Sequence, residues 1–107
     1  MEAAQNFKPE NPSFTALIGR RNLTRRYLNV PALFWRVHVG KISPMKLQDS
    51  NGQKWAINFH RAGAGSIRIG KGWIRFARAN GVKEGDVCVF ELIRRKNFGF
   101  RVTIFAS

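Results

Sequence analysis

The segment Met45–His60 restricts the fold more than any other part of the chain. Apolar and polar residues alternate in Met45–Gln48 and again in Lys54–His60. The sequence DSNG, Asp49–Gly52, joins the two runs and has the composition of a hairpin turn. A period of two fits a half-buried β-strand and does not fit a helix. The segment therefore predicts an antiparallel hairpin whose buried face carries Trp55, Ile57 and Phe59.

Further strands are predicted on both sides of this hairpin. Short apolar or alternating runs predict strands at 14–18, 67–69 and 100–105, and the uniformly apolar VCVFELI, Val87–Ile93, predicts a central strand. One helix is predicted to begin at Pro31, to end at Gly40 and to bury Leu33, Phe34 and Val37. A second helix is predicted within 72–81, with Gly81 as its C-terminal cap and a buried face formed by Trp73, Phe76 and Ala77.

These elements predict a mainly β fold with two short helices. Roughly six or seven short strands, mixed along the chain with helices, favour a small β-barrel with helical plugs at its ends. The 107 residues suffice for one compact domain. We expect a flexible tail over residues 1–12 and a single domain over residues 13–106.

Several function classes find little support in the sequence. Cys88 is the single cysteine, so no internal disulfide can form and an intracellular location is expected. With His38 and His60 it gives one ligand too few for a four-ligand zinc site. No apolar run approaches the ~20 residues of a membrane span, and the six acidic residues form no paired catalytic site. We expect no enzymatic activity, no cofactor, no metal and no membrane partner.

The stretch GSIRIGK, Gly65–Lys71, resembles a phosphate-binding loop but departs from it. Such a loop needs Ser or Thr at the next position to hold magnesium, and that position is Gly72. Ile67 and Ile69 also have the pattern of strand residues. Nucleotide binding is therefore not predicted.

The charge of the chain points to a polyanionic partner. The net charge is +13, from 19 Lys and Arg against six Asp and Glu, and the basic residues recur from Lys8 to Arg101. The excess positive charges repel one another within a small domain. Such an excess is typical of proteins that bind nucleic acid. Because the cations are distributed over segments predicted to fold, they indicate a charged surface and not a charged appendage.

The densest basic cluster lies in GRRNLTRRYLNVP, Gly19–Pro31. No acidic residue occurs between Glu10 and Asp49, which favours a nucleic-acid contact over a solvated surface loop or a membrane anchor. Asn22 suits either a bidentate contact with adenine or the capping of a turn. The candidate nucleic-acid contacts of this loop are Arg20, Arg21, Asn22, Thr24, Arg25 and Arg26.

A second candidate loop is RAGAGSIR, Arg61–Arg68. Its glycines let the backbone approach a phosphate, and Ser66 and Arg68 can donate hydrogen bonds. The alternative is a mobile hairpin tip. The candidate contacts here are Arg61, Gly63, Ala64, Gly65, Ser66 and Arg68, with Asn58 and His60 on the polar face of the strand that leads into the loop. A third basic cluster, 94–96, is expected to be an exposed turn and could form part of a nuclear import signal.

The segments NVPALFWRVHV, LQDSNGQKWAINF and IGKGWIRFARANGVKEGDVCVFELI together resemble the plant B3 DNA-binding domain, most closely its reproductive-meristem (REM) branch. The resemblance covers about residues 12–105. It implies a seven-stranded open pseudobarrel in a nuclear transcription regulator of plants, with two loops, the N-arm and the C-arm, that clamp the major groove of double-stranded DNA. The matching N-arm residues are 20–26, including Leu23, and the matching C-arm residues are 61–66, including Ala62.

The C-arm departs from members of the family with sharp sequence specificity, which carry large polar side chains there. Its tip, Ala-Gly-Ala-Gly, offers backbone to phosphates and little to base edges. We therefore expect affinity driven largely by phosphate contacts, with modest sequence preference. The alternatives are an interaction module for acidic protein or RNA partners, and the chain is expected to be one module of a longer transcription factor.

Overall fold

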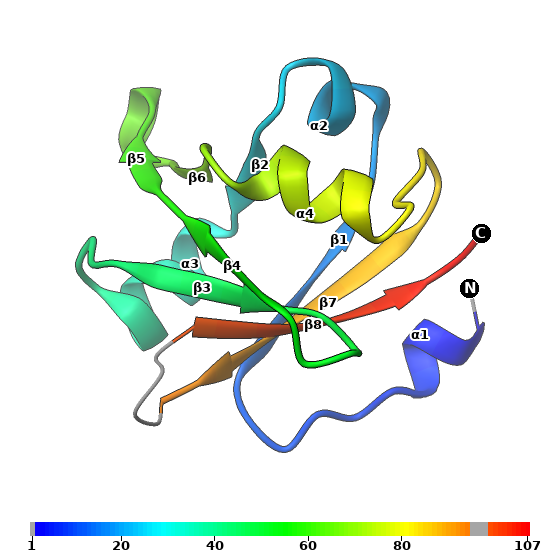
Figure 1. The fold of residues 1–107 in the computed structure, drawn as a ribbon. Helices are drawn as coiled ribbons and strands as arrows, with labels where there is room; N and C mark the ends of the chain where they lie inside the picture. Colours follow the sequence, from blue (N-terminus) through cyan, green and yellow to red (C-terminus); the bar gives the residue numbers. More distant parts are fainter. Residues whose placement is uncertain (1, 95–98) are drawn as a thin grey trace.

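Two β-sheets form the framework of the computed structural model, which describes residues 2–94 and 99–107 (Figure 1). The larger sheet has the strand order β1-β7-β8-β3-β4 and the smaller one β2-β6-β5. Neighbouring strands are antiparallel, except that β3 runs parallel to β8. The strands are β1 (Ser13–Leu17), β2 (Leu28–Val30), β3 (Met45–Gln48), β4 (Lys54–Ile57), β5 (Phe59–Arg61), β6 (Ile67–Ile69), β7 (Val87–Ile93) and β8 (Gly99–Phe105).

The predicted strand Lys54–His60 belongs to both sheets. It divides at Asn58 into β4 and β5. The Asn58 N–H donates to the Lys71 carbonyl at 3.0 Å, and the Asn58 carbonyl accepts from the Gly70 N–H at 2.9 Å. If β4 and β5 are counted as one bent strand, the fold has the seven strands expected, in an open pseudobarrel. This confirms the predicted fold class.

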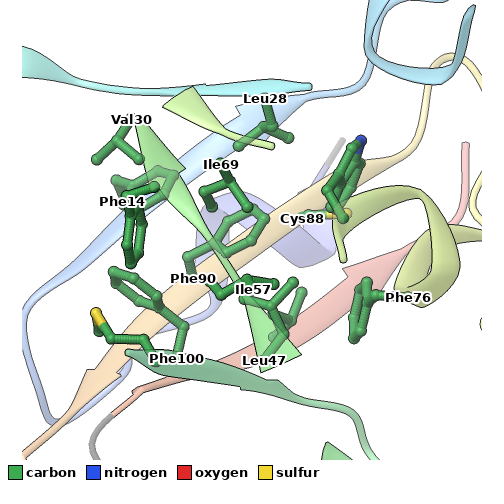
Figure 2. Packing of buried hydrophobic residues seen from close by; sticks show 14 of the residues in the cluster. Phe14, Leu28, Val30, Leu47, Ile57, Ile69, Phe76, Cys88, Phe90 and Phe100 are labelled. Atoms are coloured by element: carbon green, nitrogen blue, oxygen red, sulfur yellow. The ribbon is translucent and has the colours of Figure 1, made fainter. Parts of the chain in front are cut away.

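The core lies between the two sheets (Figure 2). Phe14 of β1 stacks on Phe90 of β7 at 4.8 Å between ring centres, and Phe100 of β8 meets both rings edge-on. Leu28 and Ile69 reach the same core from the smaller sheet. The central residues 88–92 of β7 are all buried, as their apolar run predicts for a central strand. Much of this burial is aromatic, and it holds the sheets together through the hydrophobic effect.

The DSNG turn forms the predicted hairpin between β3 and β4. Asp49 is buried, and its Oδ1 accepts hydrogen bonds from the backbone N–H groups of Asn51 and Gln53 at 3.0 and 2.9 Å. Its Oδ2 accepts one from the Trp55 indole at 3.4 Å. The carboxylate therefore organises the turn and ties it to the next strand.

The helix after Pro31 buries only part of the predicted face: Phe34 packs against the core, 5.1 Å from the Phe14 ring centre, but Leu33 and Val37 do not. The helix consists of α3 (Ala32–Phe34) and a π-helical turn, η1 (Trp35–Val39), and it ends at Gly40 as predicted. Leu33 and Val37 are 63% and 61% exposed, whereas Trp35 is buried against Phe59 at 4.9 Å. The buried stripe is thus shifted toward Trp35, because both stripes satisfy helical spacing and the indole buries more apolar surface.

The second predicted helix is confirmed as α4 (Trp73–Ala79), and it buries Trp73, Phe76 and Ala77. Gly72 precedes it with φ of 99°, and a Cβ there would lie 2.0 Å from the Ala56 carbonyl oxygen. Only glycine permits this approach of α4 to β4. Gly81 has φ of 64° where the helix ends, as expected of a C-terminal cap.

Three short helical segments lie where none was predicted. α1 (Glu2–Asn6) lies in the expected tail, and Phe7 after it packs edge-on against Phe105 at 5.6 Å. α2 (Arg20–Thr24) lies in the arginine-rich loop, and η2 (Gly63–Gly65), a 3₁₀ turn, lies in the second candidate loop. The division into a tail and one domain stays a prediction.

Candidate nucleic-acid interface

The arginine-rich loop, Gly19–Tyr27, is held in one conformation by Asn22 and is called the N-arm from here on. The Asn22 Oδ1 accepts from the Gly19 N–H at 2.8 Å, and its Nδ2 donates to the Tyr27 carbonyl at 3.1 Å. These two bonds join the beginning and the end of the arm. Of the two uses predicted for Asn22, this geometry favours the capping of a turn, because both ends of its amide are already engaged.

A tertiary contact fixes the N-arm on the body of the domain. The Trp73 indole at the start of α4 donates to the Asn22 carbonyl at 2.9 Å. Leu23 packs against the core on the inner side, and the Thr24 hydroxyl donates to the Arg20 carbonyl at 3.1 Å. The arm thus presents a rigid backbone with an apolar inner side.

The arginines occupy the outer side of this arm. Arg20, Arg21, Arg25 and Arg26 are all exposed. Within residues 2–94 and 99–107, the one salt bridge joins Arg101 to Glu91 at 3.7 Å. The four guanidinium groups therefore have no carboxylate to neutralise them in the described part of the chain, and they are free to bind an anion.

The second candidate loop, Arg61–Ser66, forms a tight turn and is called the C-arm. The Ala62 N–H donates to the Ser66 carbonyl at 2.8 Å, and the Ser66 hydroxyl donates to the Gly63 carbonyl at 2.9 Å. A Cβ at Gly63 or Gly65 would meet nothing within 4 Å. The tip is therefore open, and it carries small residues although larger ones would fit at Gly63.

The two arms lie at opposite ends of the three-stranded sheet (Figure 1). The N-arm leads into Leu28, which pairs with Ile69, while the C-arm joins Arg61 to Ile67 at the other end. Between the arms, the outward-facing row of the sheet consists of Asn29, Arg68 and His60. The three strands thus form a polar floor between two raised loops.

Arg68 connects this floor to the N-arm. Its guanidinium carbon lies 4.0 Å from the centre of the Tyr27 ring, and its Nε donates to Asn29 Oδ1 at 3.3 Å. A cation above an aromatic face is attracted by the ring quadrupole. Arg68 is half-buried, so it helps to position the floor and retains only part of its surface for a ligand.

A basic groove beside the N-arm contains residues that were not predicted. It has a volume of about 490 Å³, and His60, noted as a possible groove residue, contributes to its wall. The cations around it are Arg25, Arg26, Lys71, Arg75 and Arg78. Arg75 and Arg78 could have been found from the sequence, because their spacing places them on the exposed side of α4, away from the predicted buried face.

Acidic residues contribute little to the surface because three of them are buried and serve the fold. Asp86 accepts from the backbone N–H groups of Lys83 at 2.8 Å and Ser107 at 3.0 Å, and these bonds lower the pKa of its carboxyl. Glu91 accepts from the Asn11 side chain at 2.8 Å, and Asp49 organises the DSNG turn. Among the acids whose side chains the structure describes, Glu10 and Glu84 are the exposed ones.

The described ranges give no support to a reactive cysteine or a metal site. Cys88 is fully buried, and desolvation raises the pKa of its thiol to about 12, which makes it a poor nucleophile. No three His, Cys, Asp or Glu side chains gather as metal ligands in residues 2–94 and 99–107. None of the helices described in those ranges combines the length and the apolar character needed to cross a membrane. Of the third basic cluster, Arg95 and Lys96 lie outside the described residues.

Comparisons with known proteins agree with this geometry. The sequence profile of the B3 DNA binding domain matches residues 14–107. The chain is 32% identical over 106 residues to the B3 domain-containing transcription factor VRN1 of Arabidopsis thaliana, with 98% of the chain and 31% of the relative covered. It is 37% identical over 91 residues to the B3 domain-containing protein REM12 of the same plant, with 81% and 20% covered. The chain thus spans a third or less of the length of these relatives.

Solved structures share the fold. A hypothetical Arabidopsis thaliana protein superposes with a TM-score of 0.72 at 20% identity, over 89% of this chain and 90% of the other. The Arabidopsis FUS3–DNA complex superposes with a TM-score of 0.66 at 12% identity, over 88% and 96%. The profile match covers nearly the whole folded region, and the REM12 relationship agrees with the resemblance seen in the sequence. The chain belongs to the B3 DNA-binding domain family.

Proposed function

We propose that the chain binds double-stranded DNA as the DNA-binding module of a plant transcription regulator that acts in the nucleus. The N-arm and the C-arm contact the duplex from opposite ends of the three-stranded sheet, and affinity comes largely from phosphate contacts with modest sequence preference. The function is binding and not catalysis. Family membership supports the proposal, and so does the shared fold of FUS3, which was solved with DNA.

The observation that carries the proposal is the unneutralised charge of the N-arm beside a polar floor. Four exposed arginines lie in seven residues, and Asn22 and Trp73 fix the backbone that holds them. A rigid loop loses little conformational entropy when its side chains bind, and arginine matches the geometry of phosphate. Because Asn22 is engaged within the arm and the C-arm tip is small, few side chains remain to read base edges.

RNA or single-stranded DNA fits this surface less well. Those ligands are bound by stacking on exposed aromatic side chains. The large apolar side chains found exposed in the described structure are Leu17, Leu33, Val37 and Ile42, none of them aromatic. Tyr27 is half-buried and has Arg68 over its ring.

Fluorescence anisotropy of a labelled duplex of about 20 base pairs, over a salt series and several unrelated sequences, tests the proposal. Neutralisation of about six to eight phosphates gives a log–log salt slope of about −5 to −7. Replacement of Arg20, Arg21, Arg25 and Arg26 by Ala is expected to abolish tight binding. A matched control removes the same charge elsewhere, at four exposed lysines outside the arms: Lys41, Lys46, Lys54 and Lys83.

The control is expected to bind with only a small loss, since those lysines lie outside both arms. Binding of one sequence more than about a thousandfold over the others would contradict the phosphate-driven mode. A slope near −1, or equal losses in both quadruple variants, would contradict the clamp. No binding at about 50 mM salt would overturn the DNA proposal itself and favour an acidic protein partner.

A further inference from the structure

The basic groove beside the N-arm begins at His60 on the floor between the arms and continues to α4. Its walls come from the N-arm and from the start and exposed face of α4. Arg25 and Arg26 line it from one side, and Lys71, Arg75 and Arg78 line it from the other. All five are exposed cations, and none has a carboxylate within salt-bridge distance in the described structure.

The groove is continuous with the floor between the arms. His60 belongs both to the outward-facing row of the three-stranded sheet and to the wall of the groove. Tyr27 lines the groove and carries Arg68 of the floor over its ring. A polyanion held over the floor therefore reaches the groove directly at the base of the N-arm.

We propose that this groove binds backbone phosphates of the same duplex beyond the segment held between the arms, so that α4 lengthens the footprint on the N-arm side. This inference rests on the proposed function. The longest extent of the domain is 32 Å, which corresponds to about nine base pairs at 3.4 Å each. A duplex that covers only the space between the arms leaves the α4 cations unoccupied, and a longer one brings flanking phosphates to them.

Duplex length is the variable that tests this inference. Hairpin duplexes with stems of about 6, 9, 12 and 18 base pairs would be titrated with the wild type and with the variant K71A/R75A/R78A. The matched control is K41A/K46A/K54A, which removes three exposed lysines away from the groove. Arg75 and Arg78 lie on the exposed side of α4, where Ala is a strong helix former, so the variant is expected to fold.

The ratio of variant to wild-type Kd is expected to be near one on the shortest stem and to rise to about tenfold or more on the longest. On that stem the variant's salt slope is expected to be shallower by about two to three, because three phosphate contacts are lost. A ratio that is the same on every stem, whether near one or above it, would overturn the inference. The control ratio is expected to stay flat.

Failure of this inference is distinguishable from failure of DNA binding. If the wild type binds the long stem and loses binding when the N-arm arginines are removed, the clamp stands whatever α4 does.

A crosslinking measurement gives a second readout. Because Cys88 is buried and its thiol has a raised pKa, a photoreactive group can be attached selectively at Ala79→Cys on α4.

Crosslinks from Ala79→Cys to the flank of an 18-base-pair stem support the inference, provided that Ser50→Cys in the remote DSNG turn gives none. Equal crosslinking from both positions, or no crosslink from Ala79→Cys, would overturn it. Both positions are exposed, so attachment itself is not expected to disturb the core.

Discussion

Arg68 of β6 lies with its guanidinium carbon 4.0 Å from the centre of the Tyr27 ring, across the boundary between the sheet and the N-arm. The same side chain donates to Asn29 on β2. One arginine thus links two of the three strands of the floor, β2 and β6, to the last residue of the arm. The contact gives the floor and the arm a fixed relative position.

Replacement of Tyr27 tests that link. Tyr27→Phe keeps the aromatic face and is expected to leave the free energy of unfolding unchanged within error. Tyr27→Leu keeps apolar volume but loses the quadrupole, so the free energy of unfolding is expected to fall by about 0.5–1 kcal/mol. A double-mutant cycle with Arg68→Ala, measured by urea unfolding, is expected to give a coupling energy of similar size. Strict additivity would contradict the link.

Asn22 is expected to support DNA binding through the shape of the N-arm and not by reading a base. Asn22→Ala removes two hydrogen bonds and is expected to lower the free energy of unfolding by about 1–3 kcal/mol. It is expected to weaken binding by the same factor on every duplex, as anisotropy with single-base-substituted duplexes would measure. A loss confined to duplexes with adenine at one position would instead assign Asn22 to base readout.

The C-arm tip is expected to accept a new phosphate contact. A Cβ at Gly63 meets nothing within 4 Å, and its φ lies outside the left-handed region. Gly63→Arg is therefore expected to fold normally, to raise affinity several-fold and to steepen the salt slope by about 0.9 for one added contact. Ser50→Arg adds the same charge in the remote turn and serves as the control. Equal gains in both variants would show a general charge effect without a C-arm contact.

Gly72 is expected to be the least replaceable glycine among those in the described chain. Gly72→Ala places a Cβ 2.0 Å from the Ala56 carbonyl oxygen and forces φ of 99° on a residue with a side chain. The combined strain is expected to lower the free energy of unfolding by about 2–5 kcal/mol. Gly81→Ala has a positive φ but open space and is expected to lose only about 1 kcal/mol. Thermal or urea unfolding separates the two, and equal losses would contradict the close approach.

Asp86 is expected to make stability depend on pH in the acidic range. Its pKa is lowered from 3.8 because the Lys83 and Ser107 N–H groups donate to the carboxylate. A carboxyl whose folded-state pKa is depressed stabilises the fold fully above its unfolded pKa, and that contribution is lost as the pH falls through the folded value. The stability difference between wild type and Asp86→Asn is therefore expected to be constant from pH 7 to about 5 and to shrink below about pH 4. Urea midpoints along this series measure it, and a constant difference down to pH 2 would contradict the assignment.

Much of the fold could be predicted from the sequence because several residues are compatible with only one local structure. Asp49 organises the DSNG turn, Gly72 permits the contact of α4 with β4, and the apolar run in β7 requires burial on both faces. These are the positions where the family pattern and the local pattern agree. For that reason the residue patterns predict a small β-barrel, and the family resemblance adds that it is an open pseudobarrel of seven strands.

The wrong predictions lie where two different structures fit the same local sequence pattern. The helix after Pro31 offers two apolar stripes at helical spacing, and tertiary packing of Trp35 on Phe59 selects one of them. α2 is only five residues long, and its position depends on the bond between Asn22 and Trp73, which lie 51 residues apart. Isolated helices of that length do not persist, so no local signal predicts this one.

The candidate site was partly predictable for the same reason. The arginine cluster and the glycine-rich loop are contiguous in sequence and were found as segments. The groove required knowledge that the N-arm lies beside α4, which links Arg25 to Arg78 across distant parts of the chain. Direct contacts of any of these residues with DNA stay predictions.

The bend at Asn58 has a consequence for how this family can diversify. The strand through Asn58 anchors the C-arm in the hydrogen-bond ladder of both sheets, and the N-arm is anchored at α4. The distance between the arms is thereby a property of the scaffold and not of either loop. We therefore expect that the six residues of the C-arm, Arg61–Ser66, can be exchanged for those of another family member without a change in the spacing between the arms.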